Sequence, residues 1–153
     1  MTTLDLDLHH LRLAILEAHK SPPIQTAYCV GALLTKEFQI LATGYSRELP
    51  GNTHAEECCL LKLSDPSFAR GATIYTTMEP CNERLSGKTP CAQLLLKAGV
   101  ARVVMGVKEP PNFVAACTGA VMLRDAGVVV DYVKGLEVAM PPPEQTAKAP
   151  AAR

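Results

Sequence analysis

Segments of helical and strand periodicity alternate along this chain, and that alternation constrains its fold more than any other feature. Apolar residues at helical spacing predict helices over 8–18, 53–63, 91–98 and 119–126. Strands are predicted over 29–35, 40–45, 72–77, 102–107 and 128–130. Asp7 is the predicted N-cap of the first helix, and Ser21-Pro22-Pro23 follows its end. This order predicts a three-layer α/β/α fold, in which helices cover both faces of a five-stranded mixed sheet.

The length and the composition predict one folded domain and a short tail. A chain of 153 residues has the usual size of a single domain. From Ala139 onward it is rich in Pro and Ala and has no apolar period. We therefore expect a domain over residues 1–138 and a flexible tail over 139–153.

Charge and hydropathy exclude several classes of protein. Lys and Arg number 15, as do Asp and Glu, and this zero net charge argues against a nucleic-acid partner. No apolar run reaches the roughly 18 residues of a membrane span. The first eight residues carry Asp5 and Asp7 and no basic residue, unlike a secretory signal. The six cysteines then suggest a reducing compartment, so we expect a cytoplasmic protein without a membrane partner.

Three short motifs fall at junctions between the predicted elements. His54-Ala55-Glu56 opens the second helix, Glu79-Pro80-Cys81 follows the third strand, and Cys91 opens the third helix. One imidazole and two thiolates would give zinc three ligands and leave a fourth position for water. A helix N-terminus also favours the Cys91 thiolate. The motifs therefore predict one catalytic zinc per chain, which lowers the pKa of bound water toward neutrality.

Glu56 is the predicted catalytic acid–base residue. It lies two residues after His54, so on a helix the two side chains diverge by more than a right angle. Glu56 can then reach the water without binding the metal, take its proton and deliver that proton to a leaving amine. Zinc nucleobase deaminases combine H-x-E with P-C-x-x-C in this way. Here nine residues separate Cys81 from Cys91, so the loop between them must bulge out and return.

The remaining cysteines have a structural interpretation. Cys29 lies in the first predicted strand, whereas Cys58 and Cys59 lie among leucines of the second helix. Free cysteine packs as a small apolar residue, so we expect these three in the core. Cys58 follows His54 by four residues on the same helical face, which leaves a role as fourth zinc ligand open. Cys117 is assigned no role.

The long loop between the cysteines resembles one branch of the cytidine-deaminase-like superfamily. Thr77-Met78-Glu79-Pro80-Cys81 and Gly87-Lys88-Thr89-Pro90-Cys91 resemble the pyrimidine deaminases of riboflavin biosynthesis. Pro111-Asn112-Phe113-Val114-Ala115 and Leu123-Arg124-Asp125-Ala126-Gly127-Val128 are similar to further segments of that family. The resemblance covers 30–131. It implies a cytidine-deaminase-like fold and carries over His54, Cys81 and Cys91 as zinc ligands, with Glu56 as the catalytic residue.

The same resemblance implies a substrate and residues that contact it. In that family the substrate is a diaminopyrimidinone with a sugar phosphate, and one ring amine is hydrolysed to a carbonyl. Glu83-Arg84-Leu85-Ser86-Gly87 is most similar to fungal enzymes, which act on the ribitylamino phosphate. Lys88 and Thr89 match positions near the phosphate, where a cation and a hydroxyl suit an anion. Asn112 and Ala55 complete the implied substrate-binding set.

Other functions remain open at this stage. The ribosylamino form of the substrate is one alternative, and deamination of cytidine or of a tRNA base is another. A non-catalytic zinc subunit is a third, although such a protein would not need Glu56. Relatives of this fold are mostly dimers or tetramers, so the resemblance also implies a homodimer or a higher homo-oligomer.

Overall fold

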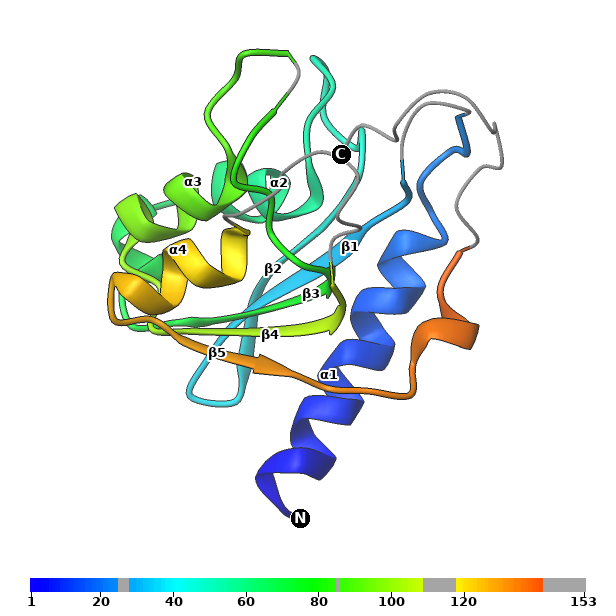
Figure 1. Cartoon of the computed structure of the whole chain (residues 1–153), viewed down its shortest axis with the longest axis vertical. Coiled ribbons are helices and arrows are strands. Elements are labelled where there is room, and N and C mark those ends of the chain that lie inside the picture. Colours follow the sequence, from blue (N-terminus) through cyan, green and yellow to red (C-terminus); the bar gives the residue numbers. More distant parts are fainter. Residues whose placement is uncertain (25–27, 85, 109–117, 142–153) are drawn as a thin grey trace.

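The computed structural model confirms the predicted α/β fold and describes residues 1–24, 28–84, 86–108 and 118–141 (Figure 1). The helices are α1 (Thr3–Ala18), α2 (Ala55–Leu61), α3 (Cys91–Ala98) and α4 (Gly119–Asp125). The strands are β1 (Gly31–Lys36), β2 (Gln39–Tyr45), β3 (Thr73–Met78), β4 (Arg102–Val107) and β5 (Val129–Tyr132). Two short 3-10 helices, η1 (Pro66–Ala69) and η2 (Glu137–Ala139), were not predicted.

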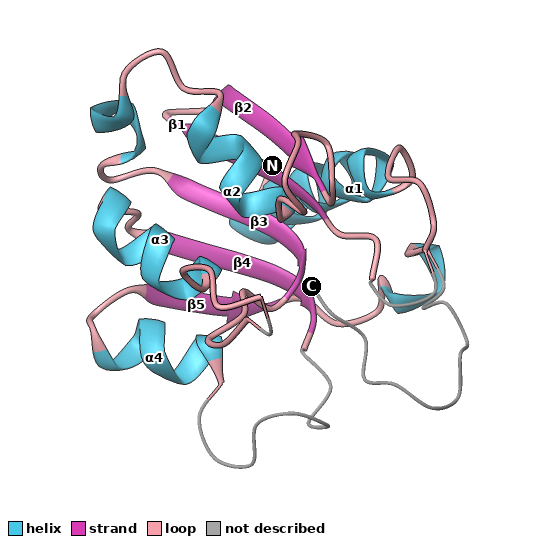
Figure 2. Ribbon diagram, turned by 90° about the horizontal axis from the view of Figure 1, so that it is seen from above, coloured by secondary structure: helices cyan, strands magenta, loops and turns pink. Residues whose placement is uncertain are grey.

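The five strands form one mixed sheet in the order β2-β1-β3-β4-β5 (Figure 2). β1 is antiparallel to both β2 and β3, whereas β3, β4 and β5 are parallel. Glu37 and Phe38 join β1 to β2 with positive φ angles of 49° and 68°, as in a type I′ hairpin turn. β2 therefore runs in the same direction as β3, β4 and β5.

Helices cover both faces of the sheet, as the sequence predicted. α2, α3 and α4 lie on one face and α1 on the other (Figures 1 and 2). Successive strand residues point to opposite faces, so Leu34 and Val103 join the core beneath α2–α4, whereas Leu33 and Val104 join the core against α1. Both faces of the central strands are thus removed from water.

The first helix begins earlier than predicted. The structure places its N-cap at Thr2, whose hydroxyl accepts a hydrogen bond from the Asp5 amide at 3.1 Å. The Asp5 carboxylate in turn accepts from the Thr2 amide at 2.9 Å. This reciprocal capping box satisfies amides at the helix start. Asp7 as N-cap was therefore wrong, and that residue lies inside α1 with its side chain buried.

Asp7 instead connects α1 to the sheet through buried polar contacts. The Arg102 guanidinium donates to both Asp7 carboxylate oxygens, at 2.8 and 2.7 Å, and the Tyr75 hydroxyl donates at 2.9 Å. Burial and the hydrogen bond to Asp7 raise the pKa of Tyr75. Arg102 also donates to Asp131 at 2.8 Å. These contacts join α1, β3, β4 and β5 near the start of β4.

The predicted tail lies mostly outside the described residues. Of its first residues, Ala139 ends η2 and its carbonyl is 3.1 Å from a ring nitrogen of His19, and Met140 packs beside the core against α1. The division into a domain over 1–138 and a tail over 139–153 stays a prediction. Within the described ranges, no helix combines the length and the hydropathy that a bilayer span requires.

α2 packs directly against β2 at Gly44. A Cβ at this position would lie 2.2 Å from the Ala55 carbonyl oxygen and 3.0 Å from the Cβ of Cys58. Only glycine allows the helix to approach the strand this closely. The contact sets the distance of the first turn of α2 from the sheet.

We expect Gly44→Ala to lower the free energy of unfolding by about 1–3 kcal/mol, because the added methyl group overpacks the α2–β2 contact. Urea denaturation of the metal-free chain measures this change. Thr43→Val is the matched control on the same strand, because it keeps the size of the side chain and faces the other side of the sheet. Equal stability of the two variants would contradict the assignment.

Candidate metal centre

The three predicted donors reach one edge of the sheet because four strands share a direction. The carboxyl ends of β2 and β3 lie at this edge, and the loops that follow them start there. His54 ends the first loop as the N-cap of α2. Cys81 lies three residues beyond β3, and Cys91 is the first residue of α3. His54 and Cys91 are therefore held at helix N-termini, and Cys81 is held in the loop that follows β3.

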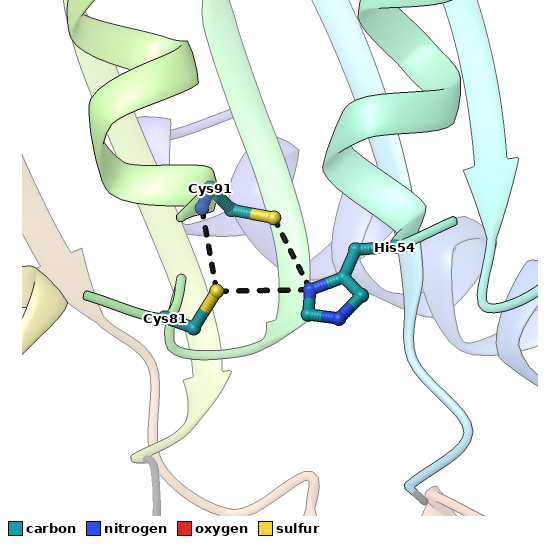
Figure 3. Close-up of side chains that lie close together, drawn as sticks. All are labelled: His54, Cys81 and Cys91. Carbon is teal, nitrogen blue, oxygen red and sulfur yellow. Dashed lines mark hydrogen bonds between the residues drawn. The ribbon is translucent and has the colours of Figure 1, made fainter. Parts of the chain in front are cut away.

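The side chains of the three donors converge in the buried interior (Figure 3). The Nδ1 atom of His54 lies 3.6 Å from the Cys81 sulfur and 3.3 Å from the Cys91 sulfur. The three donor atoms all lie within 4.8 Å of one another. The structure thus brings together the three residues that the sequence predicted as ligands.

The donor set and its dimensions fit zinc. Zn–N bonds of about 2.0 Å and Zn–S bonds of about 2.3 Å give N···S separations of about 3.6 Å in a tetrahedron. Nitrogen and thiolate sulfur are also the ligand types that zinc prefers. Among the described residues, no fourth His, Cys, Asp or Glu joins this group. One coordination position would therefore be left for water or substrate, as in catalytic rather than structural zinc sites.

The first turn of α3 fixes Cys81. The Cys91 amide donates to the Cys81 sulfur at 3.3 Å, and the Ala92 amide donates to the Cys81 carbonyl at 2.9 Å. Amides at a helix N-terminus stabilise a thiolate, so the start of α3 favours the ligand form of both cysteines. The helix thereby supplies one donor and holds the other.

Glu56 lies in the first turn of α2 and is completely buried. The Thr76 hydroxyl, on β3, donates to its carboxylate at 3.0 Å. The carboxylate is not part of the group of donor atoms formed by His54 and the two cysteines. This placement agrees with a residue that moves protons beside the metal without binding it.

Cys58 and Cys59 are buried, as the sequence predicted, whereas Cys29 precedes β1 and is only half-buried, so its predicted place in the core was wrong. The sulfur of Cys58 faces the Tyr45 carbonyl at 3.7 Å, and that of Cys59 faces the Ala42 carbonyl at 3.9 Å. Burial raises the pKa of Cys59, which keeps this thiol protonated. Among the described residues, Cys58 is not part of the group formed by His54, Cys81 and Cys91. Cys29 is half-buried, with its sulfur 3.8 Å from the Ser21 carbonyl.

Three of the four predicted substrate-binding residues lie within the described part of the chain. Lys88 is exposed in the loop between the cysteines and donates to the Gly51 carbonyl of the neighbouring loop. Thr89 is half-buried, and Ala55 is buried against β2. Asn112 lies outside the described residues, as does Cys117. The roles of all four substrate-binding residues stay predictions.

Two buried charged residues near the donors were assigned no role by sequence reasoning. The Glu79 carboxylate accepts a hydrogen bond from the Ala120 amide at 3.0 Å, which holds the start of α4 against the loop after β3. Arg84 donates to Glu57 and to two backbone carbonyls. Glu57 stands three residues after the N-cap His54, a capping-box position that could have been read from the sequence.

Comparison with known proteins supports this assignment. A family model described as the cytidine and deoxycytidylate deaminase zinc-binding region matches residues 5–107 of the chain. The matched segment contains all three donors and Glu56. It covers well over half of the sequence.

Two curated relatives indicate which kind of deaminase the chain resembles. A Schizosaccharomyces pombe protein named diaminohydroxyphosphoribosylamino-pyrimidine deaminase is 48% identical over 120 residues, covering 76% of this chain and 29% of the relative. The riboflavin biosynthesis protein RibD of Aquifex aeolicus is 36% identical over 132 residues, covering 83% of this chain and 35% of the relative. The chain therefore spans about a third of the length of these two relatives.

Solved structures have the same fold. The Rib2 deaminase of Aspergillus oryzae, solved as a C-terminal deletion mutant, aligns with a TM-score of 0.74 at 36% identity, over 86% of both chains. A second structure of that deaminase, in complex with DARIPP, aligns with the same TM-score and identity. These comparisons confirm the predicted fold and the resemblance to riboflavin deaminases. The chain belongs to the cytidine and deoxycytidylate deaminase family, whose zinc-binding region it contains.

Proposed function

We propose that this chain is a zinc-dependent hydrolase that deaminates a 2,5-diamino-6-(ribitylamino)pyrimidinone 5'-phosphate in riboflavin biosynthesis and releases ammonia. The observation that carries this proposal is the buried group of His54, Cys81 and Cys91, with the fixed carboxylate of Glu56 on the same helix turn. The names of the relatives and the DARIPP complex of the Aspergillus oryzae deaminase support the substrate class.

In this proposal His54, Cys81 and Cys91 hold one zinc ion, which when bound lowers the pKa of a water molecule and supplies a nucleophile at neutral pH. Glu56 removes a proton from the water as it attacks the ring carbon that carries the amine. Glu56 then delivers a proton to the amine, the C–N bond breaks and ammonia leaves. The Thr76 hydroxyl orients the carboxylate throughout.

The two loops at this edge supply the proposed substrate contacts. Lys88 is an exposed cation in the loop between Cys81 and Cys91, and we assign it to the substrate phosphate, because a cation suits an anion there. Thr89 adds a hydroxyl one residue further along the same loop. We assign Asn112 and Ala55 to the pyrimidine and its substituents.

The ribosylamino form of the substrate is the second candidate. The name of the Schizosaccharomyces pombe relative contains phosphoribosylamino, which favours this form. The two forms share the reacting ring and differ in the sugar chain, so the same zinc site would serve either.

Self-association and a cytoplasmic location also stay predictions. Elution as a monomer at micromolar concentration would contradict self-association.

A direct comparison of the two substrates tests the proposed function. We expect the purified chain, at about one zinc per chain, to turn over the ribitylamino phosphate faster than the ribosylamino phosphate. Ultraviolet absorbance of the pyrimidinone follows both reactions, and ammonia release confirms hydrolysis. Faster turnover of the ribosylamino form would select the second candidate. Turnover of neither compound by the zinc-loaded chain would reject the riboflavin assignment.

Glu56→Gln tests the acid–base role. We expect kcat to fall by about 10²- to 10⁴-fold, because the amide cannot take or deliver the proton. Zinc content should stay near one per chain, since the three ligands are untouched. Glu37→Gln, at the exposed hairpin turn, is the control and should keep full activity. Retained turnover in Glu56→Gln would remove this residue from the mechanism.

Cys81→Ser and Cys58→Ser test which of these two cysteines binds zinc. Loss of one of three ligands should reduce zinc content to a small fraction of the wild-type value, whereas Cys58→Ser should keep about one zinc per chain. Metal analysis after dialysis against a weak chelator measures both. The opposite pattern would identify Cys58 as a ligand and contradict the assigned donor group.

A further inference from the structure

Arg84 lies in the loop between the two cysteine ligands, and its side chain is almost completely buried although the loop around it is largely exposed. Only 2% of the Arg84 side chain is exposed, whereas Ser86, Gly87 and Lys88 are exposed residues. Hydrogen bonds offset the cost of removing a guanidinium from water; both terminal nitrogens of Arg84 have acceptors, whereas its Nε has none among the described residues. The partners of Arg84 therefore indicate what this residue holds in place.

Those partners come from three separate segments. One terminal nitrogen donates to the Glu57 carboxylate at 3.2 Å and to the Thr89 carbonyl at 3.3 Å. The other donates to the Asn52 carbonyl at 3.0 Å. Arg84 thus joins the loop before α2, the first turn of α2 and the end of its own loop. The two loops rise beside each other above α2 and α3 (Figure 1).

Each of these partners lies within three residues of a proposed zinc ligand in the sequence. Asn52 precedes His54 by two residues, and the Glu57 carboxylate also accepts a hydrogen bond from the His54 amide at 3.1 Å. Thr89 precedes Cys91 by two residues, and Arg84 itself follows Cys81 by three. One planar cation therefore connects the backbone segments that carry all three donors.

We propose that Arg84 is a positioning residue for the metal centre: it holds His54, Cys81 and Cys91 at the separation that one zinc ion requires. The inference rests on the proposed ligand set. The hydrogen bonds of Arg84 go to Glu57 and to the two loop carbonyls, and Arg84 acts through these partners. A single ammonium would replace it only in part, because lysine lacks the fork that reaches several acceptors at once.

Zinc affinity, measured by competition with a chromogenic chelator, tests this inference in Arg84→Met and Arg84→Lys. Partners outside the ligand shell typically change metal affinity by about 10- to 100-fold, and we expect a loss of that size in Arg84→Met. Arg84→Lys should recover part of it. The visible spectrum of the Co²⁺-loaded chain should also change in Arg84→Met, because the ligand geometry relaxes.

Lys62→Met is the matched control. Lys62 forms an ion pair with Glu48 at 2.8 Å at the other end of α2, and its loss should leave zinc affinity within about twofold. Thermal unfolding of the metal-free variants separates a change at the metal centre from general loss of structure. If Arg84→Met does not fold, Arg84→Lys and Glu57→Gln carry the comparison, and both should weaken zinc binding more than Lys62→Met does.

Two outcomes would overturn the inference. Wild-type zinc affinity and an unchanged Co²⁺ spectrum in the folded Arg84 variants would show that Arg84 only stabilises its loop, while leaving the proposed function intact. A wild-type chain that takes up no zinc would overturn both the inference and the proposed function. The same measurements therefore distinguish the two failures.

Discussion

The common direction of β2, β3, β4 and β5 is the constraint on which the site depends. His54 is 27 residues from Cys81 and 37 from Cys91, so the chain must close long loops to bring the donors together. The packing of the sheet offsets the entropy cost of closing these loops. Because the parallel strands end at the same edge of the sheet, the loops that follow them start close together. The glycine contact between β2 and α2 then sets the distance of His54 and Glu56 from that edge. The metal centre is thus assembled largely by backbone topology.

Polar contacts, rather than apolar packing, hold the loops at this edge. The amides of α3 fix Cys81, Glu79 fixes the start of α4, and Arg84 joins the two loops. Removing one partner of a buried charge leaves the other unpaired, which costs more than the pair contributes. These contacts therefore specify one arrangement of the loops more than they stabilise the fold, whose stability comes from the two apolar cores.

Local signals in the sequence were sufficient for much of this architecture. α3 lies between Pro90 and Gly99, and β4 is formed by a mostly apolar run. Both elements therefore begin and end where the sequence predicted. Asp7 was misassigned because a capping carboxylate and a buried one look alike locally, and the partners of Asp7, Tyr75 and Arg102, lie 68 and 95 residues away. The proposed ligands and Glu56 could be predicted because each lies in a short motif at a junction between predicted elements. The role of Arg84 could not, since it depends on Asn52 across 32 residues.

Discrimination between the two candidate substrates must come from the loops and not from the metal centre. In the proposed function, the ribosylamino and ribitylamino forms present the same amine to the zinc site and to Glu56. A site rejects an analogue strongly when buried polar groups are left without partners, and those groups must then face the sugar chain. Lys88 and Thr89 lie in the loop that Arg84 anchors. The contacts that position the ligands would therefore also limit how far this loop can adapt to a cyclic or an open sugar.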